Sequence, residues 1–174
     1  IFVTLAKKAV IGHVDIDMLA GPSEILIVAD DSANPTYLAA DLLSQAEHDP
    51  LACAILITDS ERVANAVGEE IEVQLAQLPR KEIAGTSLQQ AGKIILAKDM
   101  PTVIEMANLS APEHLEIMTK APFEIMPYIR NAGAMFLGAY SPEPLGDYYA
   151  GPNHVLPTGG TAKFYSVLNV VTFM

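Results

Sequence analysis

The sequence has little cysteine, little positive charge and no long apolar run. Its single cysteine, Cys53, leaves no disulfide framework and favours a reducing compartment, so we expect a cytoplasmic protein. The 10 lysines and arginines are outnumbered by 21 acidic residues, and the net charge of −11 without a basic cluster argues against nucleic acid as a partner. No stretch approaches the roughly 20 apolar residues that a membrane span requires, so we expect no membrane partner either.

Aliphatic runs alternate with helical patterns along a chain of 174 residues that is 51% hydrophobic. Strands are expected at 14–18, 24–29, 52–57, 93–97, 115–118 and 134–137, and helices at 1–11, 34–48, 60–77, 80–91, 101–109 and 122–131. This alternation predicts an α/β fold: a three-layer, Rossmann-like domain with a mainly parallel sheet. The sequence begins within an expected helix and stops without a turn signal, which favours a fragment of a larger protein.

The predicted helix that begins after Asn34 carries polar side chains on its apolar stripe. Gln45 lies seven residues after Leu38 and so on the same face, and His48 projects beside it. Unpaired buried polar groups cost about 1–3 kcal/mol each, so this amide and imidazole need partners. They are either a satisfied core pair or part of a metal or substrate site.

Polar residues also precede several predicted strands. Ser23, His48 and the pair Glu113-His114 each lie shortly before a strand, and the N-terminal ends of parallel strands share one edge of a sheet. Ligands of Rossmann-like folds normally bind at the opposite edge. We therefore infer that another domain carries any nucleotide. Asp147 can join the group if the irregular segment from Gly138 crosses back over the sheet.

The adjacent Glu113 and His114 are the best catalytic candidates, because a carboxylate and an imidazole supply two proton-transfer groups. Pro112 is expected to hold the residue before it in an extended conformation. The structural alternative is a surface glutamate beside a capping histidine.

Four other polar residues have plain structural interpretations. Asp147 after a glycine fits an Asx-turn, and His13 follows a glycine. His154 is either a fifth member of the site or, as we expect mainly, a residue that holds its loop by hydrogen bonds. Cys53 lies in an aliphatic strand, where a thiol behaves as a small hydrophobe.

Five segments together resemble the histidinol dehydrogenase family, in the family's order and across almost the whole chain. They are IDMLAGPSE (16–24), DLLSQAEHDP (41–50), SAPEHLE (110–116), LGDY (145–148) and GPNHVLPT (151–158). The resemblance implies zinc-dependent, NAD-linked oxidation of L-histidinol to L-histidine through L-histidinal. It also implies that residues 1–20 end a preceding domain and that residues 21–174 form the domain with the zinc and substrate residues.

The resemblance assigns roles to individual residues. By position, Gln45, His48 and Asp147 match zinc ligands, and Glu113 and His114 match the acid/base pair. Substrate contacts are implied for Ser23, Gln45, His48, His114 and Asp147. The family's NAD contacts align upstream of this sequence, and its remaining zinc ligand, a histidine, comes from the other subunit of a homodimer. We therefore expect no NAD-binding residue here, and neither zinc binding of full strength nor turnover from these residues alone.

Three other functions remain open on the residues alone. One is an aldehyde dehydrogenase with Cys53 as nucleophile, which its strand position disfavours. The second is a zinc-dependent hydrolase in which Glu113 activates a water, and the third is a non-catalytic fragment that keeps only the fold.

Overall fold

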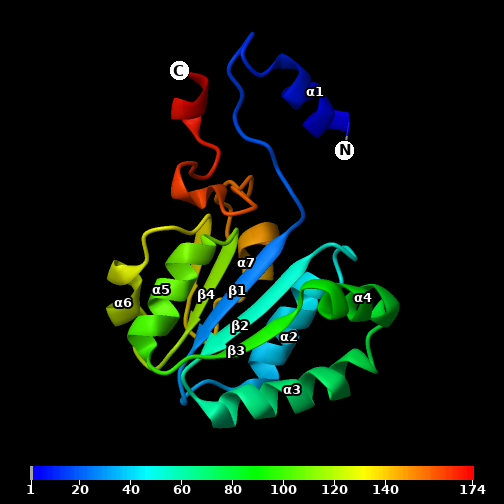
Figure 1. The fold of residues 1–174 in the computed structure, drawn as a ribbon, viewed down its shortest axis with the longest axis vertical. Helices are drawn as coiled ribbons and strands as arrows, with labels where there is room; N and C mark the ends of the chain where they lie inside the picture. Colours follow the sequence, from blue (N-terminus) through cyan, green and yellow to red (C-terminus); the bar gives the residue numbers. More distant parts are fainter. Residues whose placement is uncertain (1) are drawn as a thin grey trace.

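The computed structural model describes residues 2–174 and contains a five-stranded sheet in the order β3-β2-β1-β4-β5 (Figure 1). The strands are β1 (Glu24–Ala29), β2 (Cys53–Thr58), β3 (Lys93–Leu96), β4 (His114–Met118) and β5 (Ala134–Leu137). All neighbouring strands run parallel. These five strands match the predicted ranges to within one residue, which confirms the α/β fold.

The helices before residue 120 follow the predicted alternation, whereas a further short helix lies after Gly138, where none was predicted. The helices are α1 (Phe2–Val10), α2 (Pro35–Ala46), α3 (Glu61–Leu75), α4 (Lys81–Ala91), α5 (Met100–Ser110), α6 (Pro122–Ile125) and α7 (Glu143–Tyr148), with 3-10 turns η1 (Met126–Tyr128), η2 (Thr161–Lys163) and η3 (Val170–Phe173). Asn34 caps α2 by accepting a hydrogen bond from the backbone N–H of Thr36, and Ser60 caps α3 in the same manner through Val63. No helix among residues 2–174 is long and apolar enough to cross a membrane.

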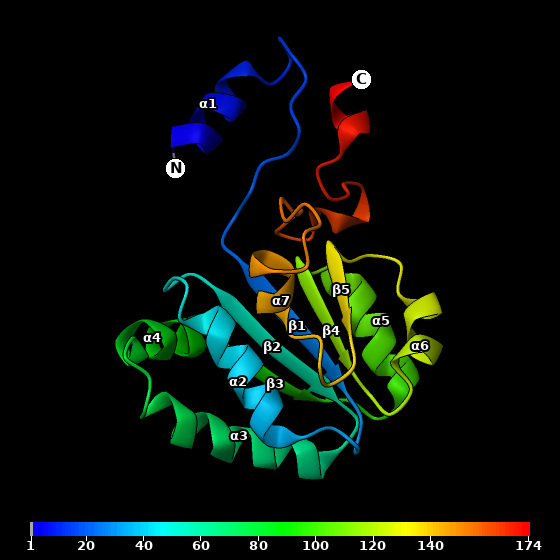
Figure 2. The same cartoon turned by 180° about the vertical axis from the view of Figure 1, so that it is seen from behind.

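Helices cover the sheet on both faces, which gives three layers (Figures 1 and 2). On one face α2, α3 and α4 bury a cluster that includes Ile27, Leu38 and Leu56. On the other face α5 packs through Val103 against Leu26 and its neighbours. Helices cover the central strands on both faces, and for this reason the sequences of these strands are continuous aliphatic runs.

Two predicted elements are wrong. Residues 14–18 form no strand and make only an isolated bridge between Ile11 and Val14, because the segment has no sheet edge to join. The helix predicted at 122–131 ends much earlier: α6 stops at Ile125, and η1 continues it only to Tyr128.

Residues 2–20 stand away from the sheet (Figure 1). No residue of α1 is buried. Its Lys7 pairs with Asp17 at 2.6 Å and donates to the carbonyl of Met18, which is itself buried. The division of the chain near residue 20 remains a prediction.

Candidate active site

Polar side chains meet where β1 and β4 begin. His114 is the first residue of β4 and lies opposite Ile25 of β1 in the sheet register. The segment after β5 returns to this end of the sheet, so that α7 lies beside the start of β1 (Figure 2). The predicted convergence at the N-terminal edge is therefore present.

His114 is held by two carbonyl acceptors. Its Nδ1 lies 2.8 Å from the backbone oxygen of Glu24 and 3.0 Å from Oε1 of Gln45. A carbonyl oxygen can only accept, so Nδ1 carries the proton. Burial lowers the pKa of His114 to about 4, which keeps the ring neutral and leaves a lone pair on Nε2.

The carboxylate of Glu113 lies next to this ring. Its Oε2 accepts a hydrogen bond from the backbone N–H of Glu24 at 2.9 Å and lies 3.6 Å from Nδ1 of His114. Burial raises the pKa of Glu113 to about 7, and the carboxylates of Glu24, Glu143 and Asp147 add to the increase. A carboxyl group that titrates near neutrality suits general acid/base catalysis.

The backbone that delivers this pair differs from the prediction. Ala111 is left-handed, with φ 50° and ψ 59°, rather than extended. It closes α5 in the conformation that helix ends commonly adopt, and Pro112 excludes the right-handed helical region for it. Gly133 then donates to the carbonyl of Pro112, and Ala134 to that of Glu113, which fixes the loop against β5.

Two further residues lie against His114: His154, for which a role in holding its loop is the main expectation, and Glu143, which the sequence does not single out. His154 Nε2 is 2.9 Å from Nε2 of His114, and Oε1 of Glu143 is 3.7 Å from the same atom and 3.5 Å from His154 Nε2. The mainly loop-holding role expected for His154 is therefore incomplete. Glu143 could have been found from its spacing, because it lies one helical turn before Asp147.

These three residues could hold a cation. Ligand atoms of His114, Glu143 and His154 all lie within 4.8 Å of one another. Imidazole nitrogen and carboxylate oxygen are donors that zinc accepts. Burial raises the pKa of Glu143 to about 7, with Asp147 and Asp41 contributing, and a bound cation would reverse this increase.

The other predicted residues surround this centre with different exposures. Gln45 is 1% exposed, as its apolar stripe predicted. His48 is exposed and lies beyond the last helical residue of α2, which corrects the prediction that it projects from the helix's last turn. Asp147 on α7 is also exposed, yet both His48 and Asp147 lie close enough to shift the pKa of His114. Ser23 is half-buried and directly precedes β1.

A second polar layer lies beneath the first. Glu116, two residues after His114 on β4, is fully buried, and its Oε1 accepts a hydrogen bond from the backbone N–H of Glu143 at 2.8 Å. Burial and the neighbouring carboxyl of Asp41 raise the pKa of Glu116. Burial likewise raises the pKa of Asp41. The two carboxyl groups together therefore hold one shared proton at neutral pH.

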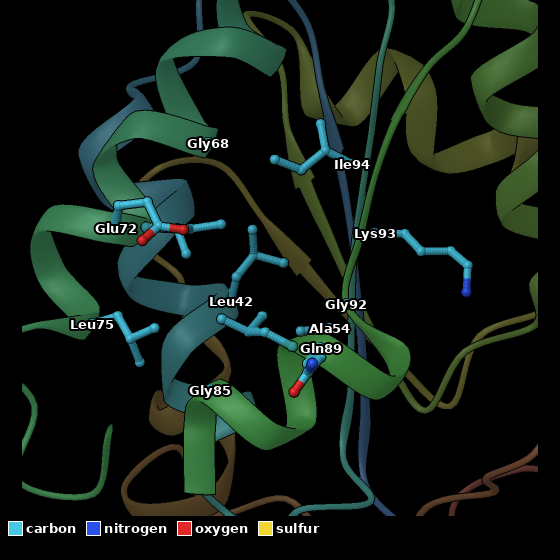
Figure 3. Close-up of a pocket in the computed structure, with 12 residues that line it drawn as sticks. Leu42, Ala54, Gly68, Glu72, Leu75, Gly85, Gln89, Gly92, Lys93 and Ile94 are labelled. Carbon is cyan, nitrogen blue, oxygen red and sulfur yellow. The ribbon is translucent and has the colours of Figure 1, made fainter. Parts of the chain in front are cut away.

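Two other features are separate from this centre. A cavity of about 390 Å³ between α2, α3, α4 and β3 is lined mainly by apolar residues such as Leu42 and Leu75, and Lys93 points away from it (Figure 3). Cys53 in β2 is half-buried, with Sγ 3.6 Å from the carbonyl of Ala91, and burial raises the pKa of its thiol. A protonated, strand-bound thiol is a poor nucleophile, which argues against the thiol-dependent alternative.

The fold and site define an α/β protein with a buried glutamate–histidine pair at the N-terminal edge of a parallel sheet. The family profile described as histidinol dehydrogenase matches residues 1–174. The chain is 62% identical over its whole length to a histidinol dehydrogenase of Heliobacterium mobile and 59% identical to that of Aquifex aeolicus, and it spans 41% of each. The chain belongs to the histidinol dehydrogenase family.

A solved structure agrees with the fold. The crystal structure of histidinol dehydrogenase from Elizabethkingia anophelis superimposes with a TM-score of 0.93 at 44% identity, covering 98% of this chain and 40% of that one. The chain therefore spans about two fifths of the relatives it matches.

Proposed function

We propose that this chain forms the zinc- and substrate-binding part of an enzyme that oxidises L-histidinol to L-histidine through L-histidinal, with NAD as the electron acceptor. The observation that carries the proposal is the contact of a neutral His114 with Gln45 and Glu24, beside a Glu113 carboxyl that titrates near neutrality. Family membership supplies the substrate class. We further propose a cytoplasmic homodimer.

The residues fit a zinc ion. Gln45, His48 and Asp147, the ligands implied by the family resemblance, offer amide oxygen, imidazole nitrogen and carboxylate oxygen at one end of α2 and on α7. Glu143 and His154 offer further donors next to His114. Bound zinc would act as a Lewis acid and orient the substrate's amine and imidazole.

The proton steps follow from the atoms. His114 Nε2 carries the lone pair, so it can take the hydroxyl proton of the alcohol while the first hydride leaves for NAD. The unprotonated carboxylate of Glu113 can then take a proton from water as that water adds to the aldehyde. The resulting hydrate gives up the second hydride and becomes the carboxylate product.

The charge of the site also matches the substrate. Glu113, Glu143 and Asp147 surround His114, and the pKa of His114 responds to Asp147 among its neighbours. A cluster of acidic side chains attracts a cationic amine and disfavours anionic ligands. L-histidinol carries such an amine and no carboxylate.

The test uses a full-length enzyme in which these 174 residues replace the matching segment of the Heliobacterium mobile protein. We expect NADH formation from L-histidinol and NAD. His114→Asn should slow the oxidation of both alcohol and aldehyde, whereas Glu113→Gln should slow the aldehyde step more. Cys53→Ala should retain full activity.

A folded chimera that forms no NADH would contradict the proposal. A chimera that hydrolyses an ester or amide without NAD would favour the zinc-dependent hydrolase. Equal effects of Glu113→Gln on both steps would refute the water-activating role of Glu113.

A further inference from the structure

Glu116 is a buried carboxyl that the proposed reaction does not use. It lies two residues after His114, so both side chains project from the same face of β4. On α2, Asp41 and Gln45 lie one turn apart and share a face. Gln45 contacts His114, and Asp41 is the acidic neighbour of Glu116. Asp41 and Glu116 therefore form a second pair of facing polar side chains, next to the pair formed by Gln45 and His114.

Glu116 also holds the start of α7. This helix begins after Pro142, which offers no side-chain cap. The acceptor comes instead from the sheet: Oε1 of Glu116 binds the backbone N–H of Glu143 at 2.8 Å. The carboxyl of Glu116 also lies beside that of Asp41 on α2, and the two groups share a proton. Burying a carboxyl group costs free energy. The hydrogen bond to the Glu143 backbone is the contact that Glu116 contributes to α7 in return.

Glu143 connects this hydrogen bond to the candidate site. Glu143 receives the bond on its backbone, and its own carboxylate faces His114 and His154. Asp147 lies one turn further along the same six-residue helix. A helix this short has little stability of its own, so an external acceptor decides where it lies.

We propose that Glu116 is a positioning residue: its hydrogen bond to the start of α7 sets the distance of Glu143 and Asp147 from His114. Its consequence for zinc rests on the proposed function, whereas its consequence for α7 does not. The side chain touches neither substrate nor cofactor. Its role requires a carbonyl-type oxygen at the right reach and does not require a charge.

Three substitutions in the chimeric full-length enzyme separate reach from charge. Glu116→Gln keeps the acceptor oxygen and the reach, Glu116→Asp keeps the carboxyl but is one methylene too short, and Glu116→Met keeps the bulk without an oxygen. The first readout is hydrogen exchange of the Glu143 amide in metal-free protein. We expect slow exchange in the unsubstituted and Gln proteins and exchange at least about tenfold faster in the Asp and Met proteins.

The second readout is zinc affinity, measured by competition with a chromophoric chelator. Outer-shell substitutions typically weaken metal affinity about 10–100-fold, and we expect this for Asp and Met but not for Gln. If Met does not fold, Asp carries the comparison. Unchanged exchange and affinity in the Asp protein would overturn the proposal.

The outcomes also distinguish this proposal from the proposed function. If the unsubstituted chimera binds no zinc while exchange still changes as expected, the zinc assignment fails and the positioning role stands. If zinc binds equally well to every variant and exchange is unchanged, the positioning role fails and the zinc assignment stands.

Discussion

Nδ1 of His114 lies 2.8 Å from the backbone oxygen of Glu24, and this contact fixes which nitrogen of the ring can react. The carbonyl accepts, so Nδ1 is protonated, and Nε2 carries the lone pair and faces Nε2 of His154 at 2.9 Å. Glu24 also donates its N–H to Glu113 at 2.9 Å. One residue at the start of β1 therefore orients both members of the acid/base pair through its backbone, which no side-chain pattern in the sequence reveals.

We predict that metal-free His114 is a neutral ring protonated on Nδ1 down to about pH 5. The reason is that burial lowers its pKa to about 4. Nitrogen-15 NMR of the imidazole rings checks this, with the exposed ring of His13 as an internal reference signal. A protonated Nε2 at neutral pH would contradict the assigned role as base.

We predict that Glu113 makes the metal-free chain less stable as pH rises. Its folded pKa is about 7 against an ordinary value of 4.5, so the folded state holds the extra proton between these values and loses stability as it is released. Each pKa unit corresponds to about 1.4 kcal/mol. Relative to Glu113→Gln, the chain should lose on the order of 1–3 kcal/mol of unfolding free energy between pH 4.5 and pH 8.

Urea unfolding at the two pH values, with chelator present, measures this difference. Glu143 titrates in the same direction, but it is present in both proteins and cancels. A Glu113→Gln protein whose stability falls as steeply with pH as that of the unsubstituted chain would show that Glu113 is not the group responsible.

We predict that Gln45 and His48 differ in what their removal costs. Gln45 is 1% exposed and bonds to His114, so Gln45→Ala should lower the free energy of unfolding by about 1–3 kcal/mol. His48 is exposed beyond the end of α2, so His48→Ala should change the free energy of unfolding by less than about 0.5 kcal/mol. Both should weaken zinc binding about tenfold or more.

Chemical denaturation and zinc competition on the same samples give both numbers. Equal zinc affinity of His48→Ala and the unsubstituted chain would remove His48 from the ligand set. The comparison separates a residue that serves both fold and site from one that serves the site alone.

The fold was predictable because its signals are local. The covered strands are aliphatic runs, and Asn34 and Ser60 cap helices where their residue types predict. The site was predictable in part, because β4 places both residues of the pair: Glu113 directly precedes the strand and His114 begins it. The left-handed Ala111 was not, since a small L-residue there leaves no compositional signal.

Glu143 was missed, and His154 was given mainly a loop-holding role, for another reason. Their approach to His114 depends on how the segment after β5 folds back, and that path is set by tertiary contacts such as the bond from Glu143 to Glu116. No periodicity in that segment reports such contacts. His48 was misplaced because α2 ends at Ala46, two residues sooner than its pattern suggested.

We predict that Gly146 sets the close approach of α7 to β5. A Cβ at this position would lie 2.7 Å from the ring of Phe136 and 3.4 Å from His154, so Gly146→Ala must displace one of them. We expect a loss of about 1–3 kcal/mol in unfolding free energy, as for other overpacked cores. The His154 ring signals should shift as well, because α7 lies against that side chain.

Gly68→Ala in α3 is the matched control. Its Cβ would meet only Ile94 Cδ1 at 3.8 Å, an ordinary contact, and alanine in a helix interior is worth up to about 1 kcal/mol over glycine. The two substitutions should therefore change stability in opposite directions. Gly146→Ala could instead prove as stable as Gly68→Ala and leave the His154 signals unshifted. That result would show that α7 is not held closely against β5. The distances from Glu143 to both histidines would then have to be larger than those described.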